Sequence, residues 1–447
     1  MSYTDFDLLF SSAPTMYALA LVISFATYFV IIRKRIHSVF DPLFINLVFA
    51  VFGAATVLFL FFTSAIKTYY FIQFCTTEFL YLICLIAVPE PRADIRLNNA
   101  PLTTPSNRRF LQGLYLSSVA VFVFSQLVTY AIAGIPLFSD NSRLQYYTGG
   151  SGFGLLSRLL DISSFFCWYL IIYRFVYQWK IKFWPALCDV LVLLLLIAAA
   201  VLSGSRSTFI NVVFIIFYFR LIHCRTPEYS LQRDAVLARL QRRILVAALV
   251  CALLVLMASG RANGIGTAVF AFCYRLMSSG DAYFMAYPHG TLSNLDSGNP
   301  FLAMFGGALE AVRLVRPTSL PEPLGFQLMY QVTGLRILFG PNPRHNVFGL
   351  VYFGFAGSMI YSALLGLSVG FVRNVGYRYV RVGGFSELIF VLCAISIVSI
   401  NTDVNAIIGP VSNLILVSPL LLMLAFALSY SGRTDYHKCD KMVAQSR

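Results

Sequence analysis

Apolar runs of about twenty residues recur along the whole chain and decide what it can fold into. An α-helix of that length crosses the hydrocarbon core of a bilayer, about 30 Å thick. Barrel strands would instead be about ten residues long with strict alternation, so the runs indicate helices. The sequence therefore predicts an all-α polytopic membrane protein, with residues 1–447 forming a single integral membrane domain. We expect about eleven transmembrane helices, at residues 14–32, 41–62, 68–88, 110–134, 155–176, 184–203, 206–223, 244–259, 346–371, 384–402 and 408–430.

The composition agrees with a bilayer location. Of the 447 residues, 58% are hydrophobic and 12% are charged, whereas soluble domains are about half apolar and about a quarter charged. The net charge of +14 does not indicate nucleic acid as a partner, because most lysines and arginines lie in alternate segments between the apolar runs. Such basic segments stay in the cytoplasm. The alternation predicts an extracytoplasmic N-terminus and a cytoplasmic C-terminus.

Two extracytoplasmic segments are longer than a connection between helices needs. One covers residues 134–154, and the other is a large loop of about 260–345. The proline, glycine, asparagine and serine content of the large loop argues against a further span. Within it, residues 267–287 mix aromatic and aliphatic side chains with two charges. This pattern predicts an interfacial helix at the membrane surface.

Ten basic residues depart from the alternation, and nine of them are arginines. The guanidinium group binds phosphate through two parallel hydrogen bonds and keeps its charge. A membrane enzyme that holds a lipid pyrophosphate would use this chemistry; ion pairs with nearby acids or contacts with lipid headgroups are the alternative explanation. The ten residues are Lys67, Arg143, Arg158, Arg206, Arg261, Arg275, Arg313, Arg316, Arg336 and Arg344.

Four ionisable residues are candidate functional residues. Arg206 stands at the entry to an apolar helix, where a charge needs a polar cavity or a partner, although an interfacial arginine also extends to the headgroups. His345 follows Arg344 directly before an apolar run; it is either a general base near neutral pH or an ordinary interfacial side chain. Glu78 and Asp161 lie inside predicted spans. For Asp161, an ion pair with Arg158 is the simplest explanation.

The sequence has neither the ligand spacing of a metal site nor a nucleotide-binding motif. Three short segments instead carry a resemblance. They are GIPLFSDNSR at 134–143, SGSRS at 203–207 opening a helix, and RHN at 344–346 leading into a glycine-spaced helix. In this order, with this number of helices and a long outer loop late in the chain, they resemble the O-antigen polymerase (Wzy) family of oligosaccharide repeat unit polymerases.

The resemblance implies a glycosyltransferase without metal or cofactor at the periplasmic face of the bacterial cell inner membrane. It would polymerise undecaprenyl-pyrophosphate-linked oligosaccharide repeat units into O-antigen (the glycan of lipopolysaccharide) or a related surface polysaccharide. Its partners would be these lipid-linked glycans, the lipid bilayer, and a chain-length regulator and a flippase of the same pathway. His345 would be the catalytic base and Asp281 the second candidate. Substrate binding is expected from Arg143, Arg206, Arg261, Arg275, Arg344, Asn346, Tyr274 and Tyr283.

Two other functions remain open. A transporter or flippase of lipid-linked oligosaccharides would account for the acids within the spans. Many transporter folds carry internal repeats, and none is evident here. A purely structural partner in a polysaccharide assembly complex gives no reason for a charge at residue 206.

Overall fold

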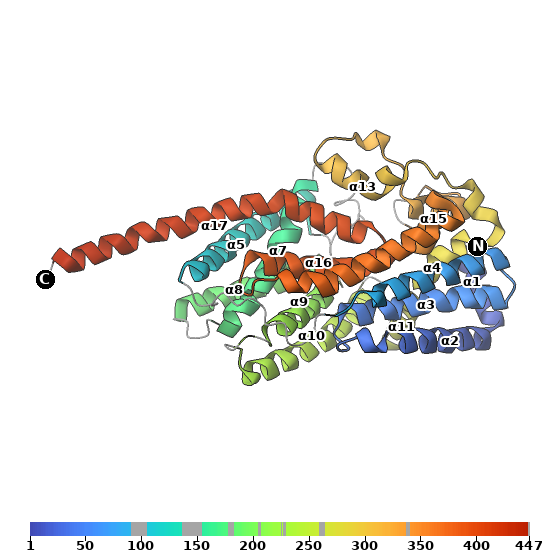
Figure 1. Cartoon of the computed structure of the whole chain (residues 1–447), viewed down its shortest axis with the longest axis horizontal. Helices are drawn as coiled ribbons and strands as arrows, with labels where there is room; N and C mark the ends of the chain where they lie inside the picture. Colours follow the sequence, from blue (N-terminus) through green and yellow to red (C-terminus); the bar gives the residue numbers. More distant parts are fainter. Residues whose placement is uncertain are drawn as a thin grey trace. The chain divides into compact units, whose positions relative to one another are not determined.

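The computed structural model describes residues 1–90, 105–135, 154–177, 183–203, 207–224, 226, 229–258, 264–336 and 340–445, and within these ranges every regular element is a helix (Figure 1). The α-helices are α1 (Tyr3–Ser12), α2 (Pro14–Ile32), α3 (Pro42–Phe62), α4 (Thr68–Ala87), α5 (Pro105–Ala133), α7 (Gly154–Tyr177), α8 (Phe183–Leu202), α9 (Ser207–His223), α10 (Leu231–Ala258), α11 (Ile265–Met277), α12 (Asp281–Ala286), α13 (Pro300–Ala311), α14 (Leu324–Thr333), α15 (Arg344–Gly370), α16 (Phe385–Ile397) and α17 (Asn405–Gln445).

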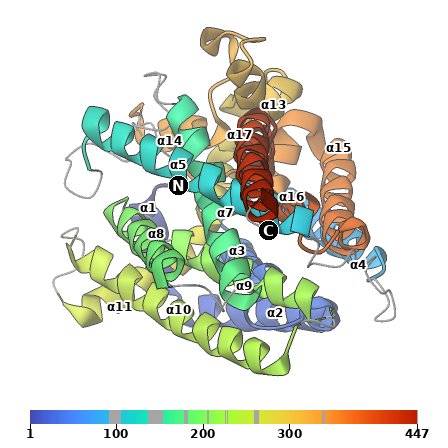
Figure 2. The same ribbon diagram turned by 90° about the vertical axis from the view of Figure 1, so that its left-hand side faces the viewer.

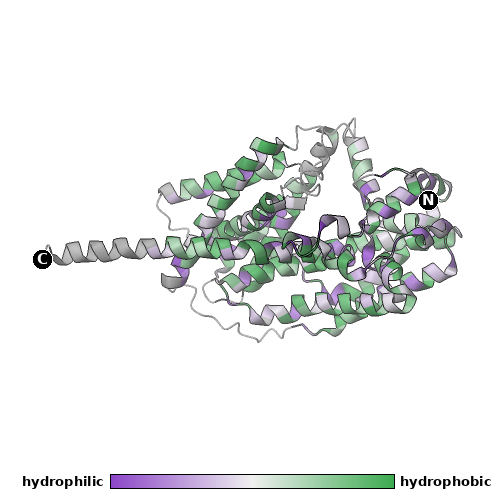
Figure 3. Cartoon of the chain, turned by 90° about the horizontal axis from the view of Figure 1, so that it is seen from above, coloured by the Kyte–Doolittle hydropathy of each residue, from purple (hydrophilic) through white to green (hydrophobic). Residues whose placement is uncertain are grey.

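Eight helices in the described residues are long and apolar enough to cross a membrane. They are α2, α3, α4, α5, α7, α8, α15 and α17. Hydrophobic residues run along most of the helices in Figure 3. The chain is therefore a multi-pass helical membrane protein, as its composition predicted.

All eleven expected spans fall on helices, but three of them are not among these eight. The expected spans 206–223, 244–259 and 384–402 fall on α9, α10 and α16. The helices α9 and α16 are short, with 17 and 13 residues. The helix α10 begins at Leu231, so charged residues such as Arg233 and Asp234 fill its first turns. The helix α1 was not expected from the sequence.

The helix α17 is continuous, and it is seen along its length in Figure 1 and almost end-on in Figure 2. It contains two prolines, Pro410 and Pro419. Transmembrane helices tolerate proline because neighbouring groups satisfy the backbone carbonyls that it leaves free.

The chain forms two compact units. Unit 1 contains Met1–Pro91, Leu249–Tyr377 and Cys393–Gly409, and unit 2 contains Arg92–Ala248, Arg378–Leu392 and Pro410–Arg447. Among the described residues, most of the buried apolar core of unit 1 comes from α2, α3, α4, α12 and α15.

In unit 1, the later part of α15 runs parallel to α4. Phe355 packs on Tyr69 near the start of α4, and Gly370 lies against Val88 at its end. Between them, a Cβ on Gly366 would lie 2.2 Å from the carbonyl oxygen of Tyr81. Only glycine allows the two backbones to approach so closely.

The helix α15 is broken at Gly354, which the apolar run in the sequence does not predict. Gly354 has φ 68° and ψ −170°, a conformation that glycine adopts and other residues rarely do. In a straight helix Gly349 and Ser358 would be about 13 Å apart. Here a Cβ on Gly349 would lie 2.9 Å from the Cβ of Ser358. Residues 344–353 therefore fold back against residues 355–370.

The segment expected to form an interfacial helix is divided into three elements. The helix α11 ends at Met277, a 3-10 turn, η3, covers Ser278–Gly280, and α12 follows. All six residues of α12 are buried. Gly280 packs directly against Thr56 of α3. The part of this segment after residue 277 is thus packed into the core of unit 1, and the expected single helix over residues 267–287 is wrong.

Unit 2 has its own buried polar contacts. Glu387, in the first turn of α16, accepts hydrogen bonds from Tyr169 and, at 2.5 Å, from the backbone N–H of Gly383. His223 of α9 lies 2.6 Å from the same carboxylate, and its other ring nitrogen is 2.7 Å from the Tyr177 hydroxyl. These side chains join α7, α9 and α16.

Candidate functional site

The RHN segment opens α15 inside unit 1. Arg344 has a positive φ of 51°, and its backbone N–H donates to the carbonyl of Thr402 at 2.9 Å. Its guanidinium donates to the carbonyls of Ser279, at 2.7 and 3.0 Å, and Phe49, at 3.3 Å. The side chain is 5% exposed. Arg344 therefore fixes the start of α15 against α3 and η3.

His345 and Glu78 face each other in the same place. His345 Nδ1 lies 3.2 Å from the carbonyl oxygen of Asn401. His345 Nε2 is 3.5 Å from Glu78 Oε2 and has no hydrogen-bond partner among the described residues. The imidazole ring also packs on Tyr81, with ring centroids 5.0 Å apart. A buried imidazole nitrogen thus lies beside a carboxylate oxygen but forms no hydrogen bond with it.

Glu78 is held from two other helices. Tyr28 of α2 donates to its Oε1 at 2.6 Å, and the Asn346 amide donates to its Oε2 at 3.2 Å. The carboxylate lies at the start of α15, where unpaired backbone N–H groups favour a negative charge. We call Glu78, His345, Asn346, Tyr28 and Tyr283 the His345 cluster.

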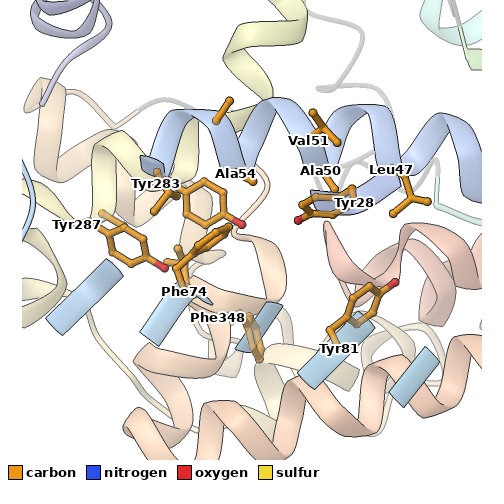
Figure 4. Close-up of a cluster of buried hydrophobic side chains, with 14 of the residues drawn as sticks. Tyr28, Leu47, Ala50, Val51, Ala54, Phe74, Tyr81, Tyr283, Tyr287 and Phe348 are labelled. Atoms are coloured by element: carbon orange, nitrogen blue, oxygen red, sulfur yellow. The ribbon is translucent and has the colours of Figure 1, made fainter. Parts of the chain in front are cut away.

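Asn346 and Tyr283 connect the cluster to α12. Tyr283 donates to the Asn346 side-chain oxygen at 2.6 Å, and Asn346 donates to Thr77 at 2.9 Å. Tyr283 stacks on Tyr287 and meets Phe74 edge-on (Figure 4). The ring centroids are 5.6 and 5.2 Å apart, respectively. The Tyr283 ring therefore forms one wall of the cluster.

The cluster lies deep in the helix bundle. Glu78 comes ten residues after Thr68, where α4 begins, which is about 15 Å along the helix. Gly53, whose Cβ would lie 3.4 Å from Arg344 Cζ, comes nine residues before the end of α3, about 14 Å. Both distances place the cluster about halfway along these two candidate spans.

Asp281, Tyr274 and Arg275 form a second group near the N-terminus of the chain. Asp281 accepts a hydrogen bond from Tyr3 at 3.1 Å, and Tyr274 donates to Asp7 at 3.0 Å. Burial raises the pKa of Asp281, against the lowering effects of Tyr3 and Arg275. Arg275 is exposed. Asp281 makes no described contact with His345, so the two candidate bases are separate.

Among the predicted substrate-binding arginines, Arg143, Arg206 and Arg261 lie outside the described residues. The RHN triplet and Tyr283 come together, and Arg344 supports this site through backbone carbonyls. No group of three or more histidine, cysteine or acidic side chains suited to a metal ion occurs in the described ranges.

One cluster residue, Tyr28, and two residues that contact the cluster were not singled out from the sequence. Gln73 and Thr77 lie four residues apart on α4, and Glu78 follows Thr77. Polar residues at this spacing lie on one face of a helix, so they could have been identified from the sequence. Gln73 donates to the Asn346 carbonyl at 3.0 Å and accepts from Tyr287 at 3.1 Å. Tyr28 had no such signal, because it is one tyrosine in an apolar run.

The comparisons with known proteins leave the site to be interpreted from its own residues. The chain matches no protein-family model, no curated protein and no solved structure.

Proposed function

We propose that the chain is a membrane glycosyltransferase that polymerises undecaprenyl-pyrophosphate-linked oligosaccharide repeat units into O-antigen or a related surface polysaccharide. The observation that carries this proposal is the His345–Glu78 pair, in which a buried imidazole nitrogen without a hydrogen-bond partner lies 3.5 Å from a carboxylate. A histidine is a common general base, and the Asn401 carbonyl, 3.2 Å from Nδ1 of His345, would orient the ring so that Nε2 is the nitrogen that accepts a proton. The resemblance in the sequence supports the same residue.

In the proposed reaction, His345 Nε2 takes the proton from a hydroxyl of the acceptor sugar. The hydroxyl oxygen then forms a bond to C1 of the donor glycan, and the bond between C1 and the pyrophosphate oxygen breaks. Undecaprenyl pyrophosphate leaves with the electron pair. Glu78 stabilises the imidazolium, and Arg143, Arg206, Arg261 and Arg275 stabilise the leaving pyrophosphate.

The substrate must reach the side chain of His345, which is 3% exposed in this structure. The segment from α11 to α12 covers the cluster through Tyr283. In the proposal this segment moves outward when the lipid-linked glycan binds. Lid movements of this kind commonly exclude water during group transfer.

The membrane arrangement belongs to the same proposal. It has eleven spans, an N-terminus in the periplasm, a C-terminus in the cytoplasm, and a location in the bacterial inner membrane. The basic segments between alternate helices support this orientation.

The alternative is a transporter or flippase of lipid-linked oligosaccharides. It is favoured by the carboxylates of Glu78 and Asp161 inside candidate spans, since such groups also mark proton and ion paths. The two functions differ in what a null strain accumulates. Loss of a polymerase leaves single repeat units on the periplasmic side, whereas loss of a flippase leaves them on the cytoplasmic side.

Replacing Arg275 or Arg206 by alanine is expected to leave the protein inserted but to abolish long glycan chains. Removing one charge-stabilising donor typically lowers a rate by about 10²–10³. Arg275 is exposed and forms no described ion pair, so its loss should not affect folding. The measurement is the length distribution of surface glycan in a deletion strain that carries each variant.

Arg316→Ala is the matched control, because Arg316 is also an exposed outer arginine and has no assigned role. It should give polymer of normal length. Normal-length polymer from Arg275→Ala and Arg206→Ala would contradict the assigned role of these arginines.

A further inference from the structure

The helix α1 lies against the segment from α11 to α12, which covers the His345 cluster. A capping box fixes its first turn. The side chains that make its contacts are spaced i, i+3, i+4 and i+7, so they share one face of the helix. They are Tyr3, Phe6, Asp7 and Phe10. All of the elements in contact here belong to unit 1.

The aromatic side chains of this face connect α12 with the candidate spans. Phe6 is 2% exposed and stacks on Phe284 of α12, with ring centroids 4.5 Å apart. The same ring meets Phe59 of α3 edge-on at 6.0 Å. Phe10 meets Tyr17 of α2 edge-on at 5.4 Å. Two spanning helices therefore support α1 from one side, and α12 packs on it from another.

Two hydrogen bonds strengthen the contact, one on each side of the turn η3. Tyr3 donates to Asp281 Oδ2 at 3.1 Å, and Tyr274 donates to Asp7 Oδ1 at 3.0 Å. Both acceptors are carboxylates, which form stronger hydrogen bonds than neutral groups do. The turn between them is the part of the segment whose carbonyl Arg344 binds. The segment is thus held at both of its ends by α1 and in its middle by the start of α15.

We propose that Tyr3, Phe6 and Asp7 form a clasp that holds the segment from α11 to α12 closed over the His345 cluster. The clasp would set how readily substrate enters, an inference that rests on the proposed function, in which this segment moves outward to admit the lipid-linked glycan. When only the open form binds a ligand, the apparent affinity is reduced in proportion to the fraction of molecules that are open. Weakening the clasp should therefore increase the open fraction and lower KM together.

Hydrogen–deuterium exchange of the full chain in lipid nanodiscs measures the opening without any substrate. Tyr3→Phe and Asp7→Ala each remove one hydrogen bond of the clasp. The backbone amides of residues 281–287 should exchange about tenfold faster in each variant, which is the effect typical of losing a hydrogen bond to a charged group. The amides of α4 should exchange as in the wild type, because the rest of unit 1 stays folded.

Leu8→Ala is the matched control. Leu8 is 67% exposed and lies on the face of α1 opposite to the clasp. Its replacement should leave exchange in residues 281–287 unchanged. The clasp is overturned if Tyr3→Phe and Asp7→Ala exchange at the wild-type rate, or if Leu8→Ala accelerates exchange as much as they do.

Polymer formation tests the regulatory role separately, with undecaprenyl-pyrophosphate-linked repeat units as substrate. Tyr3→Phe and Asp7→Ala should lower KM about tenfold, in step with the larger open fraction, and Leu8→Ala should not change it. Faster exchange with an unchanged KM would overturn the role of the clasp in substrate entry. If the wild type forms no polymer, the proposed function fails, whereas faster exchange in the two clasp variants would still support the clasp itself.

Discussion

His345→Gln is expected to abolish polymer formation while the chain stays folded and inserted. Glutamine keeps a polar group beside the Asn401 carbonyl, which His345 Nδ1 contacts at 3.2 Å, but it cannot accept the proton of the sugar hydroxyl. Loss of a general base lowers a rate by about 10²–10⁴. The measurement is the rate of lipid-linked polymer formation by purified protein, together with the glycan length distribution in a complemented deletion strain.

The control for this variant is His289→Asn. His289 is exposed and has a positive φ of 58°, which asparagine tolerates better than most residues. It should leave polymer formation unchanged. If His345→Gln polymerises at the wild-type rate, His345 is not the base and the proposed mechanism fails.

Asp41→Ala is expected to lower the free energy of unfolding by about 3–5 kcal/mol, because it leaves a buried arginine without its partner. Asp41 is fully buried and forms an ion pair with Arg373, whose side chain is 5% exposed. The same carboxylate caps α3 by accepting from the Leu43 N–H at 3.0 Å. Reversible unfolding in mixed micelles measures the change.

Glu90→Ala provides the comparison, because it breaks an ion pair that is partly exposed. The Arg35 and Glu90 side chains are 21% and 29% exposed and 3.6 Å apart. Loss of this ion pair should therefore lower the free energy of unfolding by less than about 1 kcal/mol. Equal destabilisation by Asp41→Ala and Glu90→Ala would contradict the structural role given to the buried pair.

The membrane-spanning helices were largely predictable, because length and apolarity are local properties of the sequence. The helix break at Gly354 was not, since the apolar run continues across it and only the packing of Gly349 on Ser358 reveals the reversal. The burial of α12 could not be predicted from the sequence either. Its aromatic residues suit a membrane surface as well as a protein core, and contacts with α3 decide between the two.

The candidate site could likewise be predicted only in part. The sequence singled out His345, Asn346 and Glu78, but it gave Glu78 no partner, because the partners come from α2 and from the start of α15. Arg344 was chosen for its charge. Its neighbours in space, the carbonyls of Ser279 and Phe49, determine that it supports the cluster, and no local pattern reveals them.

The central claim is tested most directly by supplying purified protein in nanodiscs with undecaprenyl-pyrophosphate-linked single repeat units. The proposal predicts a ladder of longer lipid-linked glycans and the release of one undecaprenyl pyrophosphate for each bond formed. Repeat units that stay single, with no release of undecaprenyl pyrophosphate, would contradict it.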